Sequence, residues 1–174
     1  MPATFERIAT ITKASDSASF SFTSIPQTYT DLYVSIVLTT PTTYATLGAP
    51  SLYGRFNDDS GGNYRTVQYY SSSGTYYQNY YSPSTSFVIF NQPNNQSGDV
   101  ITVSMWIKNY TNTNKAKGVL SFGSQVRANS DGFVLLNANS WTGTAAISSF
   151  SIIDNASANY GSNSTATIYG ILRA

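Results

Sequence analysis

The chain has 174 residues, neither cysteine nor histidine, a charged fraction of only 10% and a net charge of +1. The missing residue types exclude disulfide bonds, thiolate metal sites, zinc sites of the usual kind and catalysis by histidine. The few, balanced charges argue against a surface that tracks phosphates, so we expect no nucleic-acid partner. The length predicts a single domain over residues 1–174, since about 150 residues per domain is usual.

No segment reaches the roughly 18 apolar residues that a membrane span needs. Residues 1–19 also lack the basic start and apolar run of a secretory signal. We therefore expect synthesis in a cytoplasm and no membrane partner.

The first half of the chain predicts a series of strands. The clearest signal is the strict alternation after Asp31, where every second residue is apolar, which is typical of a strand with one face against a core. Pro26 cannot donate to a sheet ladder, so it must precede this strand. The predicted strands are Phe5 to Thr12, Ala18 to Ile25, Ile25 to Leu38 (after the Pro26 corner), Leu52 to Asn57 and Tyr64 to Tyr70.

Asp58 to Asn63 is a turn by every local signal, and it predicts a hairpin between the strands on either side. Oxygen ligands are dense over Asn57 to Asn63, but the calcium-loop pattern with its bidentate Glu is absent. Local bonding of Asp and Asn to backbone amides explains this segment better, so we expect no metal. Arg55 is placed to pair with Asp58 or Asp59.

The second half continues in the same manner, with Gly123 interrupting one strand as a possible bulge. Loops are expected over 39–50 and 92–99, and no window predicts an amphipathic helix. The predicted strands are Thr85 to Phe90, Val100 to Tyr110, Gly118 to Val126, Phe133 to Leu136, Ala145 to Ile153 and Thr165 to Leu172.

About ten short strands, spaced near ten residues apart with turn chemistry between them, predict an all-β antiparallel sandwich. A jelly roll satisfies the pattern. An immunoglobulin-like sandwich is the alternative, and the missing Cys-Trp-Cys pattern counts against it.

Six tyrosines fall within one short window, and two interpretations of them remain open. Tyrosine is enriched at protein interfaces, so the cluster fits contact with a neighbouring subunit. Flat aromatic rings also stack on sugars, with Gln78 and Asn79 placed to bond hydroxyls, so the cluster fits glycan binding. The residues are Tyr69, Tyr70, Tyr76, Tyr77, Tyr80 and Tyr81.

A glycosidase needs two carboxylates that face each other across a cleft. Glu6 is the only glutamate, and nearly all of the seven aspartates lie in turn-like contexts that capping explains. We therefore expect no enzymatic activity, no catalytic residues and no cofactor.

The segment Ile25 to Leu32 resembles a motif of small β-sandwich virion proteins of tailed bacteriophages, including cyanophages. Three further pieces fit in the same order across nearly the whole chain: Phe5 to Thr10, Arg55 to Asp59 leading to Asn63-Tyr64, and Ala166 to Ile171. Such proteins serve as decoration, head-fibre or tail-fibre proteins, and the tyrosine-rich stretch Tyr69 to Tyr81 is not part of their pattern.

The resemblance implies a structural virion protein, made in the host cytoplasm and located in the virion. We expect a capsid decoration, or cement, protein that binds the major capsid protein as a homotrimer. The alternative is a tail- or head-fibre domain that binds host glycans through Tyr76, Tyr77, Tyr80 or Tyr81. The lack of a coiled-coil shaft before the strand at Phe5 favours decoration.

Overall fold

The computed structural model describes residues 5–41, 51–72, 74–91, 98–126, 132–154 and 160–172. Within these ranges the chain forms twelve strands in two antiparallel sheets, and it contains no helix. Parts of the two predicted loops, 42–50 and 92–97, lie outside the described residues. No helix long and apolar enough to cross a membrane occurs in the ranges described.

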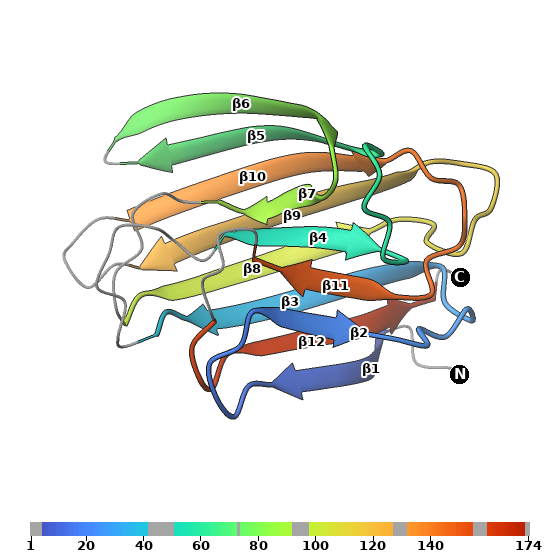
Figure 1. The fold of residues 1–174 in the computed structure, drawn as a ribbon, viewed down its shortest axis with the longest axis horizontal. Coiled ribbons are helices and arrows are strands. Elements are labelled where there is room, and N and C mark those ends of the chain that lie inside the picture. The colour runs from blue at the N-terminus through green and yellow to red at the C-terminus, as the bar shows by residue number, and fades with distance from the viewer. Residues whose placement is uncertain are drawn as a thin grey trace.

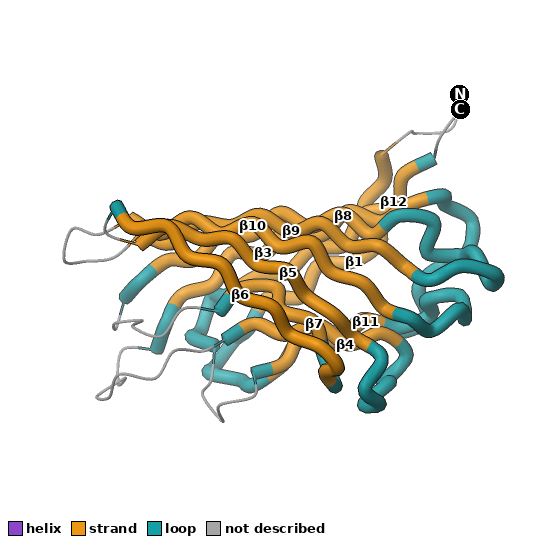
Figure 2. Tube along the Cα trace, turned by 90° about the horizontal axis from the view of Figure 1, so that it is seen from above, coloured by secondary structure: helices purple, strands orange, loops and turns teal. Residues whose placement is uncertain are grey.

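The two sheets lie face to face, as Figures 1 and 2 show, and the larger one extends well past the smaller. In spatial order the larger sheet contains β1 (Phe5–Thr12), β12 (Thr165–Ile171), β3 (Asp31–Thr39), β8 (Val100–Ile107), β9 (Lys117–Val126), β10 (Gly132–Trp141), β5 (Tyr64–Ser72) and β6 (Thr75–Ser84). The smaller sheet contains β2 (Ser19–Phe22), β11 (Phe150–Ile153), β4 (Leu52–Phe56) and β7 (Phe87–Phe90).

The strand order is that of a jelly roll. Strands β1 to β4 alternate between the two sheets, and β7–β8 and β11–β12 cross between them in the same way. The quartet β1-β12-β3-β8 thus faces the quartet β2-β11-β4-β7. Two hairpins, β9–β10 and β5–β6, continue the larger sheet beyond β8. The predicted antiparallel β-sandwich is confirmed.

The core lies between the sheets and follows from the alternation in the strands. In β3 the four apolar residues of one face are each at most 1% exposed, as predicted: Leu32, Val34, Ile36 and Leu38. The smaller sheet contributes aromatic rings, among them Phe56, which lies 5.0 Å from Phe87 and 5.5 Å from Phe150 between ring centroids. Each ring removed from water in this way stabilises the fold by roughly 1.5–3 kcal/mol.

The predicted hairpin between β4 and β5 is wrong. Strand β4 pairs with β11 and β7 in the smaller sheet, whereas β5 pairs with β10 and β6 in the larger one. The turn after Phe56 is therefore a crossover between sheets. The Tyr64 hydroxyl accepts a hydrogen bond from the Phe56 backbone N–H at 3.0 Å, and burial raises the pKa of Tyr64 to about 12.

Strand β7 is held against the inner side of the larger sheet by polar side chains. The Val88 N–H donates to Thr66 Oγ1 at 3.1 Å, and Asn137 Nδ2 donates to the carbonyls of Val88 at 3.1 Å and Ile89 at 2.8 Å. An edge strand offers unpaired backbone groups, and here buried side chains satisfy them. This explains why polar residues point into the interior from β5 and β10.

Gly123 does not mark a bulge, because β9 keeps a regular register with both β8 and β10 across it. A Cβ at this position would lie 3.0 Å from the Phe90 ring and 3.0 Å from the Thr102 carbonyl oxygen. The glycine is required by close packing. Other strands also differ from expectation. Strand β10 runs for ten residues, β11 covers only the end of the segment predicted from Ala145, and β2 covers only part of the segment predicted from Ala18. Strand β6 was not predicted.

Candidate interaction face

The six tyrosines singled out in the sequence lie on the hairpin β5–β6, at one edge of the larger sheet. Because side chains alternate along a strand, the hairpin divides them between its two sides. The cross-strand register places Tyr69, Tyr76 and Tyr80 on the outward side, and Tyr70, Tyr77 and Tyr81 on the side that faces the smaller sheet. The structure thus brings them together as two groups of three and not as one platform.

On the inward side, Tyr70 and Tyr77 stack with ring centroids 4.8 Å apart and planes at 15°. Tyr70 also contacts Phe133 at 5.4 Å, which joins this pair to the core. Asn79 Nδ2 donates to Gln68 Oε1 at 3.0 Å, so this amide, proposed as a sugar ligand, already serves the hairpin.

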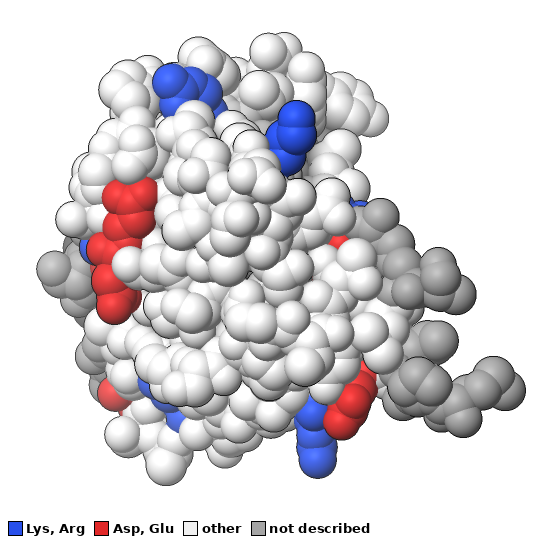
Figure 3. Space-filling view, turned by 90° about the vertical axis from the view of Figure 1, so that its right-hand side faces the viewer, with Lys and Arg blue, Asp and Glu red and all other residues white. Residues whose placement is uncertain are grey.

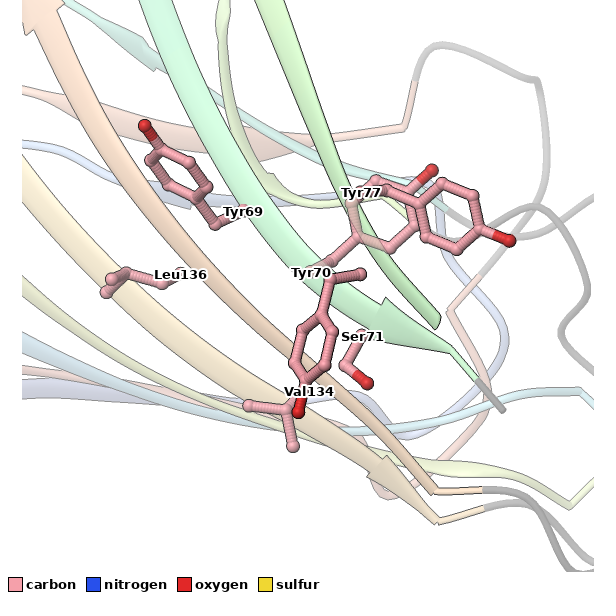
Figure 4. Close-up of a pocket in the computed structure, with 7 residues that line it drawn as sticks. Tyr69, Tyr70, Ser71, Tyr77, Val134 and Leu136 are labelled. Carbon is pink, nitrogen blue, oxygen red and sulfur yellow. The ribbon is translucent and has the colours of Figure 1, made fainter. Parts of the chain in front are cut away.

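Where the hairpin meets β10, a groove of about 210 Å³ is lined by the outward residues and also by Tyr70 and Tyr77 of the stacked pair. Figure 4 shows Val134 and Leu136 from β10 beside Ser71 and Tyr69 from β5. The register agrees, since Leu136 lies opposite Tyr69 and Val134 opposite Ser71. Tyr76 and Tyr77, both exposed, complete the groove on β6, and Ser71 adds an aliphatic hydroxyl to walls that are otherwise apolar or aromatic.

This groove is part of a broader apolar surface, which we call the outer face, on the solvent side of β8, β9, β10 and β5. Cross-strand pairing makes the surface continuous: Trp106 lies opposite Leu120, Phe122 opposite Leu136, and Leu136 opposite Tyr69. Phe122 is 55% exposed. A single exposed apolar residue is normal on a protein surface, but Phe122 belongs to a continuous apolar group. The outer face comprises Trp106, Leu120, Phe122, Val134, Leu136 and Tyr69.

Aromatic packing extends the outer face towards the other edge of the sheet. Tyr33 on β3 lies 4.9 Å from Trp106 and 6.0 Å from Tyr169 on β12, between ring centroids. A second hollow of about 220 Å³ lies on β3, β8 and β9, where Phe122 borders small outward residues that include Ser35 and Ser104. The surface is therefore ridged, with hydroxyl groups at the bottom of a depression.

Charged residues stand only at the margins of this surface. Apart from Arg65 near the start of β5, the outward positions on β3 from Tyr33 onward and on β8, β9, β10, β5 and β6 contain no Asp, Glu, Lys or Arg. Lys108 lies at one end, paired with Asp31 at 3.0 Å, and Arg65 at another. Figure 3, a view onto the end of the sandwich, likewise shows few charges, separated by uncharged surface.

Sequence reasoning missed the outer face, although β9 and β10 carry a signal for it. Their alternation is partly inverted: Ser121 and Asn137 point inward and are fully buried, whereas Phe122 and Leu136 point outward. The polar inward residues serve the backbone of β7, as described above. When the polar residues of a strand point inward and bond buried groups, its apolar residues point outward, towards solvent or a partner.

The turn Asn57 to Asn63 is a structural crossover. Asp59 accepts hydrogen bonds from Trp141 Nε1 at 2.6 Å, from Asn63 Nδ2 at 2.9 Å and from the Gly61 N–H at 2.9 Å. The bond from the Trp141 indole is the main reason that the pKa of Asp59 lies below its usual value. The described residues contain no cluster of three or more metal-ligating side chains.

The predicted ion pair of Arg55 with Asp58 or Asp59 is wrong. Arg55 Nε donates instead to the Thr85 carbonyl oxygen at 3.0 Å, and no salt bridge joins Arg55 to the described aspartates. Asn57 is also engaged elsewhere, because its amide donates to the Ala146 carbonyl at 2.8 Å.

No family model and no curated protein matches this sequence. Among solved structures, the alginate lyase Aly36B is similar with a TM-score of 0.36 and 10% sequence identity, over 95% of this chain and 81% of that one. A double mutant of Aly36B in complex with an alginate trisaccharide has a TM-score of 0.35 and 12% identity at the same coverage. A second double mutant, with an alginate tetrasaccharide, has a TM-score of 0.33 and 10% identity.

The expectation that the chain is not an enzyme is contradicted by these neighbours, which are lyases, and we withdraw it. A likeness at 10–12% identity concerns the fold alone. The strand order defines the class as a jelly-roll sandwich, and its larger sheet has an extended, apolar outer face.

Proposed function

We propose that this chain is a structural protein of a bacteriophage virion, and that it decorates the capsid by binding the assembled shell through its outer face. The single observation that supports this most is the continuous, uncharged surface around Phe122 and Leu136. Monomeric proteins seldom expose apolar patches larger than a few hundred Å², and larger ones mark contact sites. The resemblance of the four sequence segments to phage virion proteins is the reason for proposing a virion as the location of this chain.

A decoration protein of this kind acts by mass action. Because it binds the assembled shell and not its separated subunits, each bound copy shifts the equilibrium towards the shell. An apolar face with hydroxyl-lined hollows gives modest affinity for one copy, and symmetric copies on a lattice add avidity. The major capsid protein is the partner that this proposal requires.

Particles lacking this chain provide the test. We expect them to release their genome at a lower temperature and after a milder osmotic shock than intact particles, and we expect added purified protein to restore the difference. Particles that resist heat and shock equally well with and without the chain would remove the proposed role.

A second candidate function is binding of host surface glycans by a fibre-type protein, which the outward groove favours. Its walls include Tyr69 and Tyr76, and Ser71 offers a hydroxyl between them. On a glycan array, binding that Tyr76→Ala abolishes and Tyr80→Ala leaves intact would favour this candidate, because Tyr80 lies on the same strand outside the groove. An array without any signal would eliminate it.

A further inference from the structure

The four edges of the two sheets are protected to different degrees. Edge strands offer unpaired N–H and C=O groups, and proteins blunt them by shortness, charges, bulges or coverage. Strand β1 carries Glu6 and Arg7 and a register shift between Arg7 and Ala9. Strands β2 and β7 have four residues each, and side chains of the larger sheet already bond the backbone of β7.

Strand β6 lacks these devices over most of its length. It has ten residues, none of them charged, and from Thr75 to Tyr81 it pairs with β5 in unbroken register. Figure 1 places it at the rim of the larger sheet, beyond β5, and no described strand lies on its other side. Only Pro83, close to its end, cannot donate to a ladder, so the open edge comprises Thr75 to Tyr81.

The side chains of this edge complement a second copy of themselves. On the outward side the order is Tyr76, Gln78, Tyr80, and on the inward side it is Tyr77, Asn79, Tyr81. Each triplet has a tyrosine at both ends and an amide residue at its centre, so its order is the same in both directions. An antiparallel pair related by a two-fold axis through the sheet brings such triplets face to face.

We propose that β6 is a dimerisation edge, at which two copies of this chain pair antiparallel and join their larger sheets into one. A two-fold axis at Gln78 places Tyr76 opposite Tyr80 of the other copy, and an axis at Asn79 places Tyr77 opposite Tyr81. Directly opposed aromatic pairs each add about 0.2–1 kcal/mol to the backbone bonds. The absence of charge on the edge matters, because near a two-fold axis a charged residue meets its own like charge.

This inference goes beyond the proposed function and does not rest on it, since the pairing follows from the edge alone. It also differs from the trimer that the sequence led us to expect. If both proposals hold, the dimer carries two outer faces on the same side of one continuous sheet, which doubles the surface offered to a shell.

The first experiment is native mass spectrometry and sedimentation of the purified full chain, with Gln78→Lys as the variant and Thr12→Lys as the matched control. Both positions are exposed and lie on edge strands of the larger sheet, but Thr12 is on the opposite edge, β1. We expect a dimer that Gln78→Lys weakens about tenfold or more and that Thr12→Lys leaves unchanged. A monomer, a trimer, or a dimer that both variants affect equally would overturn the proposal.

The second experiment covers the case in which the lysine variant does not fold. The chain has no cysteine, so Gln78→Cys, Asn79→Cys and Thr12→Cys each introduce a single thiol. Opposed residues of an antiparallel pair have Cβ atoms about 4.5–5.5 Å apart, close to the spacing of a disulfide. Mild oxidation should cross-link the variant at the axis, Gln78→Cys or Asn79→Cys, far more than Thr12→Cys. Equal cross-linking of all three would contradict β6 pairing.

Discussion

Asp59 shows how single side chains hold the crossover between the sheets. Its carboxylate accepts from the indole of Trp141, the amide of Asn63 and the backbone of Gly61, so it joins the turn to β10. The sequence predicted local bonding of this aspartate, because Asp and Asn in a Gly-rich turn bond nearby amides. It did not predict Trp141, which is distant in the chain and reaches the turn only because β10 lies beside β5.

We predict that Asp59→Asn destabilises the protein by about 1–2 kcal/mol near neutral pH, because it weakens charge-assisted bonds from three donors. The folded-state pKa of Asp59 is lowered, so its contribution is present above the unfolded pKa near 4 and is lost as the pH falls through the folded pKa. Urea unfolding should therefore show a difference that shrinks in acid. Asp58→Asn, at the exposed neighbour, is the control and should change little at either pH.

At the scale of elements, the β3 strand was predicted correctly in its inward residues, because the alternation from Leu32 to Leu38 is strict. The β4–β5 hairpin was not, because a turn sequence does not specify whether the next strand stays in the same sheet. That depends on distant partners: Phe56 pairs with Phe150, and Tyr64 with Trp141. The outer face was missed for the same reason. The alternation in β9 and β10 is inverted because their polar side chains point inward to bond the backbone of β7, which is distant in the sequence.

The attachment of β7 makes a prediction for Thr66. Replacing it by Val keeps the shape but removes the acceptor for the buried Val88 N–H, which should cost about 1–3 kcal/mol. Thr10→Val is the matched control, because the Thr10 hydroxyl bonds Thr167 in an exposed position. Its effect should stay within about 0.5 kcal/mol. Equal denaturation midpoints for the two variants would refute the role given to Thr66.

The packing of the Phe87 ring over Gly54, its cross-strand neighbour within the smaller sheet, makes a prediction for this glycine on β4. A Cβ there would lie 2.1–2.6 Å from three atoms of the Phe87 ring, so Gly54→Ala must displace a fully buried aromatic side chain. We expect a loss of about 1–3 kcal/mol in the free energy of unfolding. Gly118→Ala on β9, where a Cβ meets nothing within 4 Å, should be nearly neutral in the same thermal-melt experiment.

At the scale of the whole molecule, the two sides of the larger sheet have different tasks. The inner side packs on the smaller sheet and supplies polar groups to β7, whereas the outer side leaves Phe122 and Leu136 in solvent. The spacing of the predicted strands indicated an antiparallel sandwich, and that much is confirmed. Where the uncharged residues gather depends on the order of strands, and this order could not be read from any local pattern.

The outer face makes a direct prediction for binding. Phe122→Lys and Leu136→Lys should each weaken the affinity for empty shells, measured by co-sedimentation, by at least about tenfold. The reason is that each variant places a charge within an apolar contact. Both side chains are exposed, so melting temperatures should change little. Ser21→Lys, at an exposed position on the smaller sheet, is the matched control and should bind normally. Normal binding by both face variants would exclude the outer face as the docking surface.

The copy number of this chain per virion tests the central claim most directly, by quantitative mass spectrometry of purified particles against the major capsid protein. Decoration of a shell lattice predicts hundreds of copies, in a fixed ratio to the capsid protein. A few to a few tens of copies would place the chain on the tail or on fibres and would favour the glycan-binding candidate. Its absence from the particle would contradict the virion proposal altogether.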